Sequence, residues 1–290
     1  MKVDNAVIMA AGTSSRFAPL SYEKPKALIE ARGEVLIERQ IKQLKEAGIR
    51  EIILVTGYKK DQFNYLKDKY GIKTLFNSEY SIRNNNSSIW TAKDYLGNSY
   101  VCSADNYFSI NPFEREVEDS YYAAEYSEGE TSEWCMTENP EGFVDTVEIG
   151  GRDAWYMMGH TFWSCDFSNK FLQILAAEYN KQDTAGKLWE KIYIEHLDIL
   201  KMRIRKYDPD VIYEFDTLDE LRKFDESYVI NTRSSLIKRI AEELRLSEKD
   251  MNGFKCIDGD DAEAVGFEFL CPSGHYRYYY DKDQLETVNN

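Results

Sequence analysis

Two cations near the N-terminus have the type and spacing needed to hold a triphosphate. Arg16 ends a loop of small residues, Gly12-Thr13-Ser14-Ser15, and Lys26 follows in the segment Lys24-Pro25-Lys26. The backbone N–H groups of a small-residue loop can approach phosphate oxygens closely. An ordinary turn with two surface cations is the alternative. The combination of the loop, Arg16 and Pro25-Lys26 at this spacing favours a phosphate site.

Two acids are candidate ligands for a divalent cation. Asp105 follows the strand-like run 100–103, and Asp216 ends the strand-like run 212–216. Ligands bind at the carboxyl ends of strands in parallel α/β sheets, so the two carboxylates could converge on one ion. Mg²⁺ prefers hard oxygen ligands and commonly takes one or two carboxylates together with substrate phosphates. The ordinary role of an aspartate after a strand is that of a turn residue.

Alternating strands and helices must position these residues. Apolar runs predict strands at 6–11, 52–55, 73–76 and 100–103, with helices between them. This series predicts an α/β fold with a doubly wound, mainly parallel sheet. After residue 120, short aromatic-rich runs predict a mixed second sheet region, which is followed by helices over 166–179 and 186–200.

The composition excludes several classes of protein. The 290 residues include 36 basic and 51 acidic side chains, which give a formal net charge of -15. Such a surface repels nucleic acids and anionic membranes, so we expect neither as a partner. The longest apolar runs are too short to span a bilayer. The five cysteines are too far apart for zinc or redox motifs, which predicts reduced thiols and a cytoplasmic protein.

The N-terminal motifs resemble those of a known family. The run from Ala10 to Arg16, followed by Pro19-Leu20 and 24–28, is similar to the signature of the sugar-nucleotidyltransferases. The resemblance covers roughly residues 3–228 and is closest to the bacterial choline-phosphate cytidylyltransferases. Later segments that carry it are 53–58, 77–80, 104–107, 131–134, 159–163 and 213–216. Two departures, Ser14 for a glycine and Phe17 for a leucine, leave Arg16 and Lys26 in place.

The resemblance implies transfer of a cytidylyl group from CTP to phosphocholine, which gives CDP-choline and pyrophosphate. It implies catalytic roles for Lys26, Arg16 and Asp105, and Mg²⁺ held by Asp105 and Asp216. The acceptor phosphate is largely ionised at neutral pH, so its oxygen can attack the α-phosphorus directly, in line with the leaving pyrophosphate. We predict nucleotide binding by Ala10, Ala11, Gly12, Thr13, Ser14, Ser15, Arg16, Lys26, Tyr58, Asn85 and Ser88.

Recognition of choline sets a further requirement. A quaternary ammonium donates no hydrogen bond and is bound by aromatic faces and carboxylates. We therefore predict acceptor-binding roles for Trp134, Glu133, Trp163 and Trp189, although most aromatic residues of this half fill the core. The alternatives are cytidylyl transfer to 2-aminoethylphosphonate or another phosphorylated small molecule, with a sugar 1-phosphate less expected, and a non-enzymatic nucleotide sensor.

The predicted domain organisation has two parts. Residues 1–230 form the nucleotidyltransferase domain, with a nucleotide-binding half over 1–110 and an acceptor-binding half over 111–230. Residues 231–290 form an appendage of unknown role, with a helix that begins near Ser234 and a hairpin over 266–280. A lid or a dimerisation element is the simplest role for it, and a homodimer is left open.

Overall fold

The computed structural model describes residues 1–259 and 263–288. The chain forms two compact units, which are described separately. Unit 1 comprises Met1–Gly12 and Ile37–Glu214, and unit 2 comprises Thr13–Leu36 and Phe215–Asn290. Both units are discontinuous in sequence, because the segment Thr13–Leu36 belongs with the C-terminal part of the chain. The predicted division at residue 230 does not follow these units and stays a prediction.

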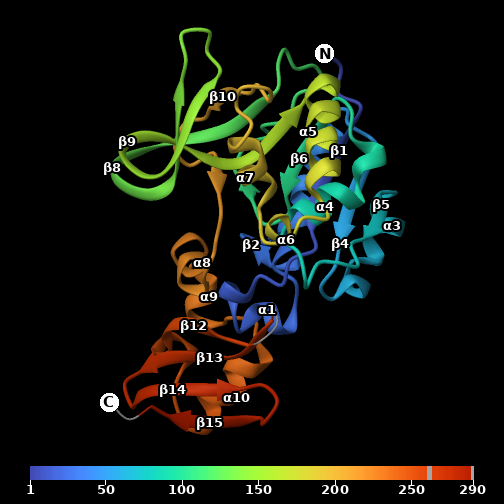
Figure 1. Cartoon of the computed structure of the whole chain (residues 1–290). Coiled ribbons are helices and arrows are strands. Elements are labelled where there is room, and N and C mark those ends of the chain that lie inside the picture. The colour runs from blue at the N-terminus through green and yellow to red at the C-terminus, as the bar shows by residue number, and fades with distance from the viewer. Residues whose placement is uncertain (260–262, 289–290) are drawn as a thin grey trace. The chain divides into compact units, whose positions relative to one another are not determined.

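Unit 1 is built on a seven-stranded sheet (Figure 1). Its order is β10-β8-β9-β6-β1-β4-β5, and β6, β1, β4 and β5 are parallel neighbours. These four strands are β1 (Asn5–Ala10), β4 (Ile52–Thr56), β5 (Lys73–Phe76) and β6 (Ser99–Ser103). The sequence prediction of a mainly parallel α/β sheet is confirmed for this half of the molecule.

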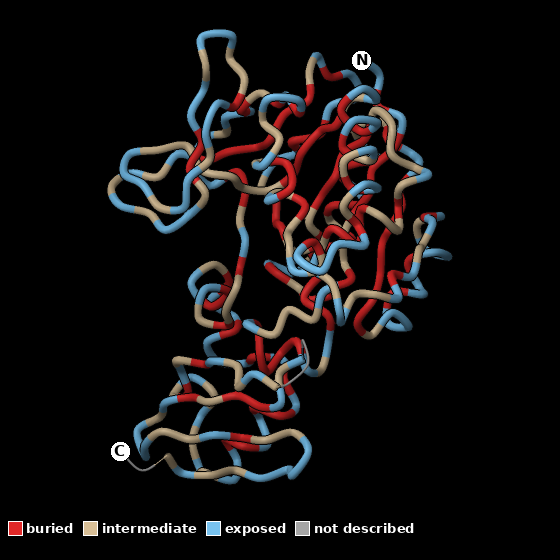
Figure 2. The backbone as a smooth tube through the Cα atoms, viewed as in Figure 1, coloured by how far each residue is buried: buried red, intermediate tan, exposed pale blue. Residues whose placement is uncertain are grey.

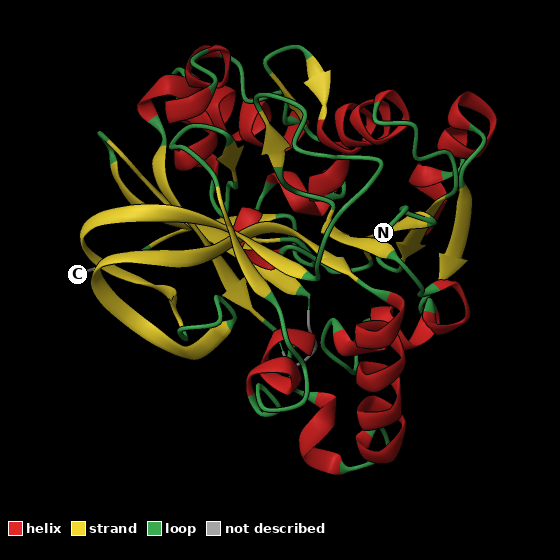
Figure 3. Ribbon diagram, turned by 90° about the horizontal axis from the view of Figure 1, so that it is seen from above, coloured by secondary structure: helices red, strands yellow, loops and turns green. Residues whose placement is uncertain are grey.

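Both faces of the central strands are covered. Val7 and Ile8 point to opposite faces of β1, and both are completely buried. Every residue of β4 is buried as well, which explains its continuous β-branched and aliphatic sequence. Figure 3 shows helices and strands in separate colours. The helices of this part of the chain are α2 (Leu36–Glu46), α3 (Tyr65–Tyr70), α4 (Asn86–Thr91), α5 (Cys165–Glu178), α6 (Gln182–Ala185) and α7 (Trp189–Ile194).

The mixed region predicted after residue 120 continues the same sheet. Strand β8 (Tyr121–Glu138) pairs antiparallel with β9 (Val144–Trp163), and β10 (Arg203–Lys206) runs parallel to β8. The inner ends of β8 and β9 are buried, whereas the outer part of this hairpin is largely exposed (Figure 2). A short ladder joins β7 (Tyr107–Phe108) to β11 (Ile212–Tyr213).

One helix is shorter than predicted. The sequence predicts a helix over 186–200, but α7 begins at Trp189 and ends at Ile194. Beyond it the chain forms turns, in which Leu200 N–H donates to the backbone oxygen of His196. These turns bring the buried Leu200 into the main core of unit 1, which also holds Trp163, Phe171 and Trp189. Packing of Leu200 therefore ends the helix earlier than its sequence pattern suggested.

Unit 2 combines the Thr13–Leu36 segment with the C-terminal part of the chain. The segment forms η1 (Ser15–Phe17), α1 (Leu20–Glu23), η2 (Lys26–Leu28), β2 (Glu30–Ala31) and β3 (Glu34–Val35). The C-terminal part forms α8 (Leu218–Phe224), α9 (Ser227–Ile230), α10 (Ser235–Leu244), η5 (Glu248–Asp250), β12 (Asn252–Asp258), β13 (Ala264–Cys271), β14 (Gly274–Tyr279) and β15 (Gln284–Thr287).

The C-terminal part contains the predicted helix and hairpin. Strands β12–β15 form an antiparallel sheet in sequence order, and the predicted hairpin is its β13–β14 pair. Ser234 caps α10, since its Oγ accepts a hydrogen bond from Ile237 N–H at 3.0 Å. In the described part of the chain, no helix combines the length and apolar character needed to cross a bilayer.

Candidate active site

Asp216 brings together the two cations that the sequence assigned to phosphate binding. Its Oδ2 lies 2.6 Å from Nη1 of Arg16, and its Oδ1 lies 3.4 Å from Nζ of Lys26. Lys26 is buried, whereas the Arg16 side chain is 72% exposed. All three residues belong to unit 2, so this charge cluster is complete within one unit.

The loop before Arg16 has a special backbone conformation. Ser14 adopts the left-handed region with φ 51° and ψ 45°, which favours glycine. The backbone oxygens of Ser14 and Ser15 accept hydrogen bonds from the N–H groups of Phe17 and Ala18 and close the η1 turn. The departure from the family signature at residue 14 therefore falls at the position where a side chain is least favourable.

The predicted nucleotide-binding residues of unit 1 lie at the carboxyl end of the sheet. Ala10 pairs with Thr56, and Met9 pairs with Ser103, so β1, β4 and β6 end side by side. Tyr58 N–H donates to the backbone oxygen of Ala11 at 3.0 Å. Only glycine fits before Tyr58, because a Cβ on Gly57 would lie 2.6 Å from that same oxygen.

Asn85 and Ser88, the two predicted base contacts, have partners inside unit 1. Asn85 Oδ1 accepts a hydrogen bond from Trp189 N–H at 2.7 Å. The buried Ser88 Oγ accepts one from Asn77 Nδ2 at 3.2 Å. Asn85 therefore fixes the start of α7, and a contact with the base stays a prediction for both residues.

Asp105 lies two residues after the end of β6 at Ser103, beside the end of β1. The preceding residue, Ala104, donates its N–H to the backbone oxygen of Met9 at 3.1 Å. Asp105 belongs to unit 1 and Asp216 to unit 2, so their joint role at one ion stays a prediction. The predicted strand over 212–216 is wrong in its extent, because β11 ends at Tyr213 and Asp216 lies in the following loop. Carboxylate oxygens are hard donors of the kind that Mg²⁺ takes beside substrate phosphates. Among the described residues, no group of three or more His, Cys, Asp or Glu side chains assembles around a metal position.

A carboxylate that the sequence analysis did not single out, Glu190, lies among aromatic residues. Its Oε2 accepts a hydrogen bond from Asn85 Nδ2 at 3.0 Å, and its Oε1 lies 3.5 Å from the Tyr122 hydroxyl. The Tyr122 ring stacks on Trp189 with centroids 5.8 Å apart. Burial raises the pKa of Glu190 to about 7, because the ionised carboxylate loses hydration. A cation bound beside it would restore the ionised form.

Further acids surround the same aromatic region. Burial raises the pKa of Tyr156 to about 12, and the nearby charges of Glu125 and Glu214 add to this rise. Burial also raises the pKa of Tyr122, and the charges of Glu190 and Glu214 act in the same direction. Tyr122, Tyr156, Glu190 and Glu214 are called the acid–aromatic cluster below.

Comparison with known proteins identifies the family. A choline-phosphate cytidylyltransferase from Streptococcus pneumoniae is 34% identical over 221 residues, which cover 76% of this chain and 96% of that relative. A 2-aminoethylphosphonate cytidylyltransferase from Lancefieldella rimae is 33% identical over 235 residues, which cover 79% and 95%. The chain belongs to the nucleotidyltransferase family that contains these cytidylyltransferases. Residues 6–108 match the MobA-like NTP transferase domain.

Two solved structures of related enzymes support the assignment of this chain to the nucleotidyltransferase family. The CTP:phosphocholine cytidylyltransferase LicC from Streptococcus pneumoniae aligns with a TM-score of 0.74 at 33% identity and covers 78% of this chain and 99% of its own. The inositol-1-phosphate CTP transferase from T. maritima aligns with a TM-score of 0.59 at 13% identity, over 76% and 92% of the two chains, which shows a shared fold. The predicted family and nucleotidyltransferase activity are confirmed.

The four predicted acceptor residues of this nucleotidyltransferase differ in exposure. Trp163 and Trp189 are completely buried, and their rings lie 5.0 Å apart within the core. Trp134 is partly buried and Glu133 is exposed, both on β8. The charge of Glu133 acts on Tyr156, which links it to the acid–aromatic cluster. Core packing accounts for Trp163 and Trp189, and the acceptor roles of all four stay predictions.

One feature of the sequence could have identified Glu190 as a candidate site residue. It follows Trp189 directly in the segment Leu188-Trp189-Glu190, so an acid adjoins a residue already predicted to bind the acceptor. Glu214 stands two residues before Asp216 and was likewise not singled out. Asn106 Nδ2, next to Asp105, lies 3.5 Å from the Glu214 carboxylate. Glu190 is partly buried and Glu214 is exposed, and the sequence does not report that the charges of both act on Tyr122.

Proposed function

We propose that this nucleotidyltransferase transfers the cytidylyl group of CTP to phosphocholine and releases pyrophosphate. The observation that carries the choice of acceptor is the acid–aromatic cluster, in which the Glu190 carboxylate lies 3.5 Å from the Tyr122 hydroxyl and the Tyr122 ring stacks on Trp189. A trimethylammonium group is attracted by aromatic faces and by carboxylates, and it leaves no N–H donor unsatisfied in such a site. A neutral sugar would need more hydrogen-bonding side chains than this cluster offers.

The proposed reaction is an in-line displacement at the α-phosphorus. An oxygen of the acceptor phosphate forms the new O–P bond, and the bond from the α-phosphorus to the bridging oxygen of the β-phosphate breaks. No general base is needed, because a phosphomonoester with a second pKa near 6 is mostly a dianion at neutral pH. Arg16 and Lys26 neutralise the charge of the triphosphate and of the leaving pyrophosphate. Asp105 and Asp216 would hold Mg²⁺, which supplies further charge neutralisation at the phosphates.

2-Aminoethylphosphonate is the second candidate acceptor. Its primary ammonium carries three N–H donors, and the carboxylates of Glu190 and Glu214 could accept hydrogen bonds from them. The two cytidylyltransferase relatives are almost equally similar to this chain, at 34% and 33% identity. The aromatic faces favour phosphocholine, since a primary ammonium gains less from them than from additional acceptors.

Pyrophosphate release with CTP and a panel of acceptors tests the proposal. The panel contains phosphocholine, 2-aminoethylphosphonate and a sugar 1-phosphate, each with CTP, UTP, ATP or GTP. We expect the highest kcat/KM with CTP and phosphocholine. Faster turnover of another acceptor would make the assignment of phosphocholine wrong. Tight nucleotide binding without turnover on any acceptor would support a nucleotide sensor instead.

The proposal includes a cytoplasmic location. Both expected substrates are small charged molecules, and no nucleic acid or membrane is needed for the reaction. A reducing compartment would keep the five cysteines, Cys102, Cys135, Cys165, Cys256 and Cys271, as thiols.

A further inference from the structure

The appendage over 231–290 contacts the segment that carries the proposed triphosphate cations. Both parts belong to unit 2. The alignment with the Streptococcus pneumoniae relative covers 96% of that protein with 76% of this chain, so the rest of this chain has no counterpart there. The function of the family therefore does not by itself account for the appendage.

Glu23, at the end of α1, is the centre of the contact. Its Oε1 accepts hydrogen bonds from Leu236 N–H and Ser235 Oγ, both at 2.8 Å, and from Ser234 Oγ at 3.2 Å. Its Oε2 accepts one from Ser235 N–H at 3.2 Å. A carboxylate at the first turn of α10 binds backbone donors that have no partner within the helix, and it lies at the positive end of the helix dipole. Glu23 thus joins the signature segment to the start of α10.

Two further contacts lie on either side of Glu23 in the sequence. The ring of Tyr22 stacks on Tyr280, with centroids 3.7 Å apart and planes 6° from parallel. Strand β12 lies against η1, the turn that contains Arg16. The charge of Arg16 also acts on the Cys256 thiol of β12, whose pKa burial raises. The C-terminal part of unit 2 therefore contacts the segment at η1 as well as at α1.

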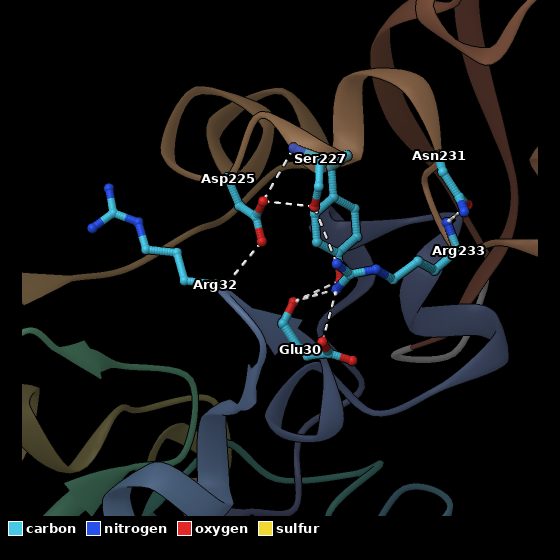
Figure 4. A network of polar contacts seen from close by, with 7 residues as sticks. Glu30, Arg32, Asp225, Ser227, Asn231 and Arg233 are labelled. Carbon is cyan, nitrogen blue, oxygen red and sulfur yellow. Dashed lines mark hydrogen bonds and ion pairs between the residues drawn. The ribbon is translucent and has the colours of Figure 1, made fainter.

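A polar network fixes the far end of the same segment (Figure 4). Arg233 Nη1 donates to the backbone oxygen of Glu30 at 3.2 Å, and the Tyr228 hydroxyl donates to it at 2.6 Å. Two residues later, Arg32 N–H donates to the Asp225 carboxylate at 2.8 Å. Lys26 lies between Glu23 and Glu30, so both flanks of this buried cation are anchored to the C-terminal part of unit 2.

We propose that the appendage is a scaffold for the signature segment, with Glu23 as the positioning residue that holds Arg16 and Lys26 where the triphosphate binds. This inference rests on the proposed function for its catalytic consequence. Glu23 touches no reacting atom in this account. Its effect passes through the position of the segment on which the two cations stand.

Amide hydrogen exchange of the full chain tests the scaffold without relying on activity. In Glu23→Ala, we expect faster exchange over 13–28 and around 234–237, with the strands of unit 1 unchanged. Glu23→Gln keeps an acceptor oxygen and should restore much of the protection. Glu243→Ala removes an exposed acid of α10 and serves as the matched control. Faster exchange confined to α10, with 13–28 as in wild type, would overturn the proposal and leave Glu23 as a helix cap only.

A second variant weakens the contact between Glu23 and α10 by changing Ser235 instead of Glu23. Ser235→Pro removes the N–H and the hydroxyl that bind Glu23, while proline at the first helical position is compatible with a stable α10. We expect kcat/KM for CTP to fall about tenfold to a hundredfold in Glu23→Ala and in Ser235→Pro, because small displacements of positioning groups have effects of this size. The KM of the acceptor at saturating CTP should change little.

The two tests separate failure of the scaffold from failure of the proposed function. Unchanged kcat/KM for CTP in both variants, with normal exchange over 13–28, would contradict the scaffold in an active enzyme. A wild-type chain without transferase activity would contradict the proposed function, and the exchange experiment would still report whether Glu23 fixes the segment.

Discussion

Asp216 Oδ2 lies 2.6 Å from Arg16 Nη1, although the two residues are far apart in the sequence. The same carboxylate reaches Lys26 through its other oxygen. Three residues that the sequence assigned separately to phosphate and metal binding therefore form one charge cluster in unit 2. The carboxylate of Asp216 thus lies between the two cations, and it balances part of their charge.

The first prediction concerns Asp216. Asp216→Asn should lower kcat/KM by at least about a hundredfold, or about 3 kcal/mol, because it removes a carboxylate expected to hold Mg²⁺ at the phosphates. The midpoint of thermal unfolding should fall only modestly, since the ion pair with the exposed Arg16 contributes little to stability and asparagine keeps an acceptor oxygen for the buried Lys26. Asp208→Asn, at an exposed position, is the matched control. Activity at the wild-type level in Asp216→Asn would remove Asp216 from the mechanism.

The second prediction concerns the backbone of the phosphate loop. Ser14→Gly should leave the free energy of unfolding equal to or above that of wild type, because glycine adopts φ 51° without a Cβ penalty of about 1 kcal/mol. Ser15→Gly, one residue later in η1, should lower it by about 0.5–1 kcal/mol. Denaturant unfolding of both variants measures the difference. Equal losses in the two variants would mean that Ser14 is not strained.

The third prediction is a pH dependence caused by Glu190. Its folded pKa of about 7 lies above the ordinary value of 4.5, so the folded state binds the proton more tightly. The free energy of unfolding therefore decreases as the pH rises from 4.5 to 7, because the carboxyl loses its proton more readily in the unfolded chain. Above pH 7 this loss of stability is complete. Glu190→Gln cannot ionise and should gain about 1–3 kcal/mol relative to wild type between pH 4 and pH 8. A stability difference that is independent of pH would show that Glu190 ionises normally.

The raised pKa of Glu190 also predicts how the binding of phosphocholine depends on pH. In wild type, the KM for phosphocholine should fall as the pH rises from 6 to 8, because ionised Glu190 attracts the ammonium. Phosphocholine itself titrates near pH 6, so the informative quantity is the difference between wild type and Glu190→Gln. The KM ratio of the two proteins should grow with pH. A constant ratio would place Glu190 outside the acceptor site.

The fourth prediction concerns Trp134, the partly exposed tryptophan of the predicted acceptor set. Trp134→Ala should raise the KM for phosphocholine about thirtyfold, equivalent to about 2 kcal/mol for one cation–π contact. Trp134→Phe should retain most of the affinity because a π-face remains, whereas Trp134→Leu should not. The KM for CTP serves as the control. Equal losses for both substrates, with lower stability, would mark Trp134 as a packing residue.

Local patterns in the sequence predicted the strands and the site residues that adjoin them. The run of β4 is buried at every position, as its apolar sequence predicted. Asp105 comes shortly after β6, and the sequence predicted this position after a strand. These features depend on a few neighbouring residues. The short α7 was not predictable in this way, because burial of Leu200 against distant residues decides where the helix ends.

Long-range contacts account for most of what the sequence did not predict. Glu23 and Ser235 lie 212 residues apart, and no periodicity or motif links them. Their contact places the Thr13–Leu36 segment in unit 2, whereas the sequence grouped that segment with the first strand. Glu190 was missed for a related reason. Its pKa depends on burial among Tyr122 and Trp189, which only the folded chain reveals.

The central claim is that CTP and phosphocholine are the substrates, and a competition experiment tests it most directly. The enzyme, CTP and Mg²⁺ are mixed with equal concentrations of phosphocholine and 2-aminoethylphosphonate, and ³¹P NMR follows both products, since phosphonate and phosphate signals are well separated. The initial ratio of products equals the ratio of the two kcat/KM values. We expect CDP-choline to exceed the phosphonate product by at least about tenfold. A phosphonate product that forms as fast as CDP-choline, or faster, would contradict the account.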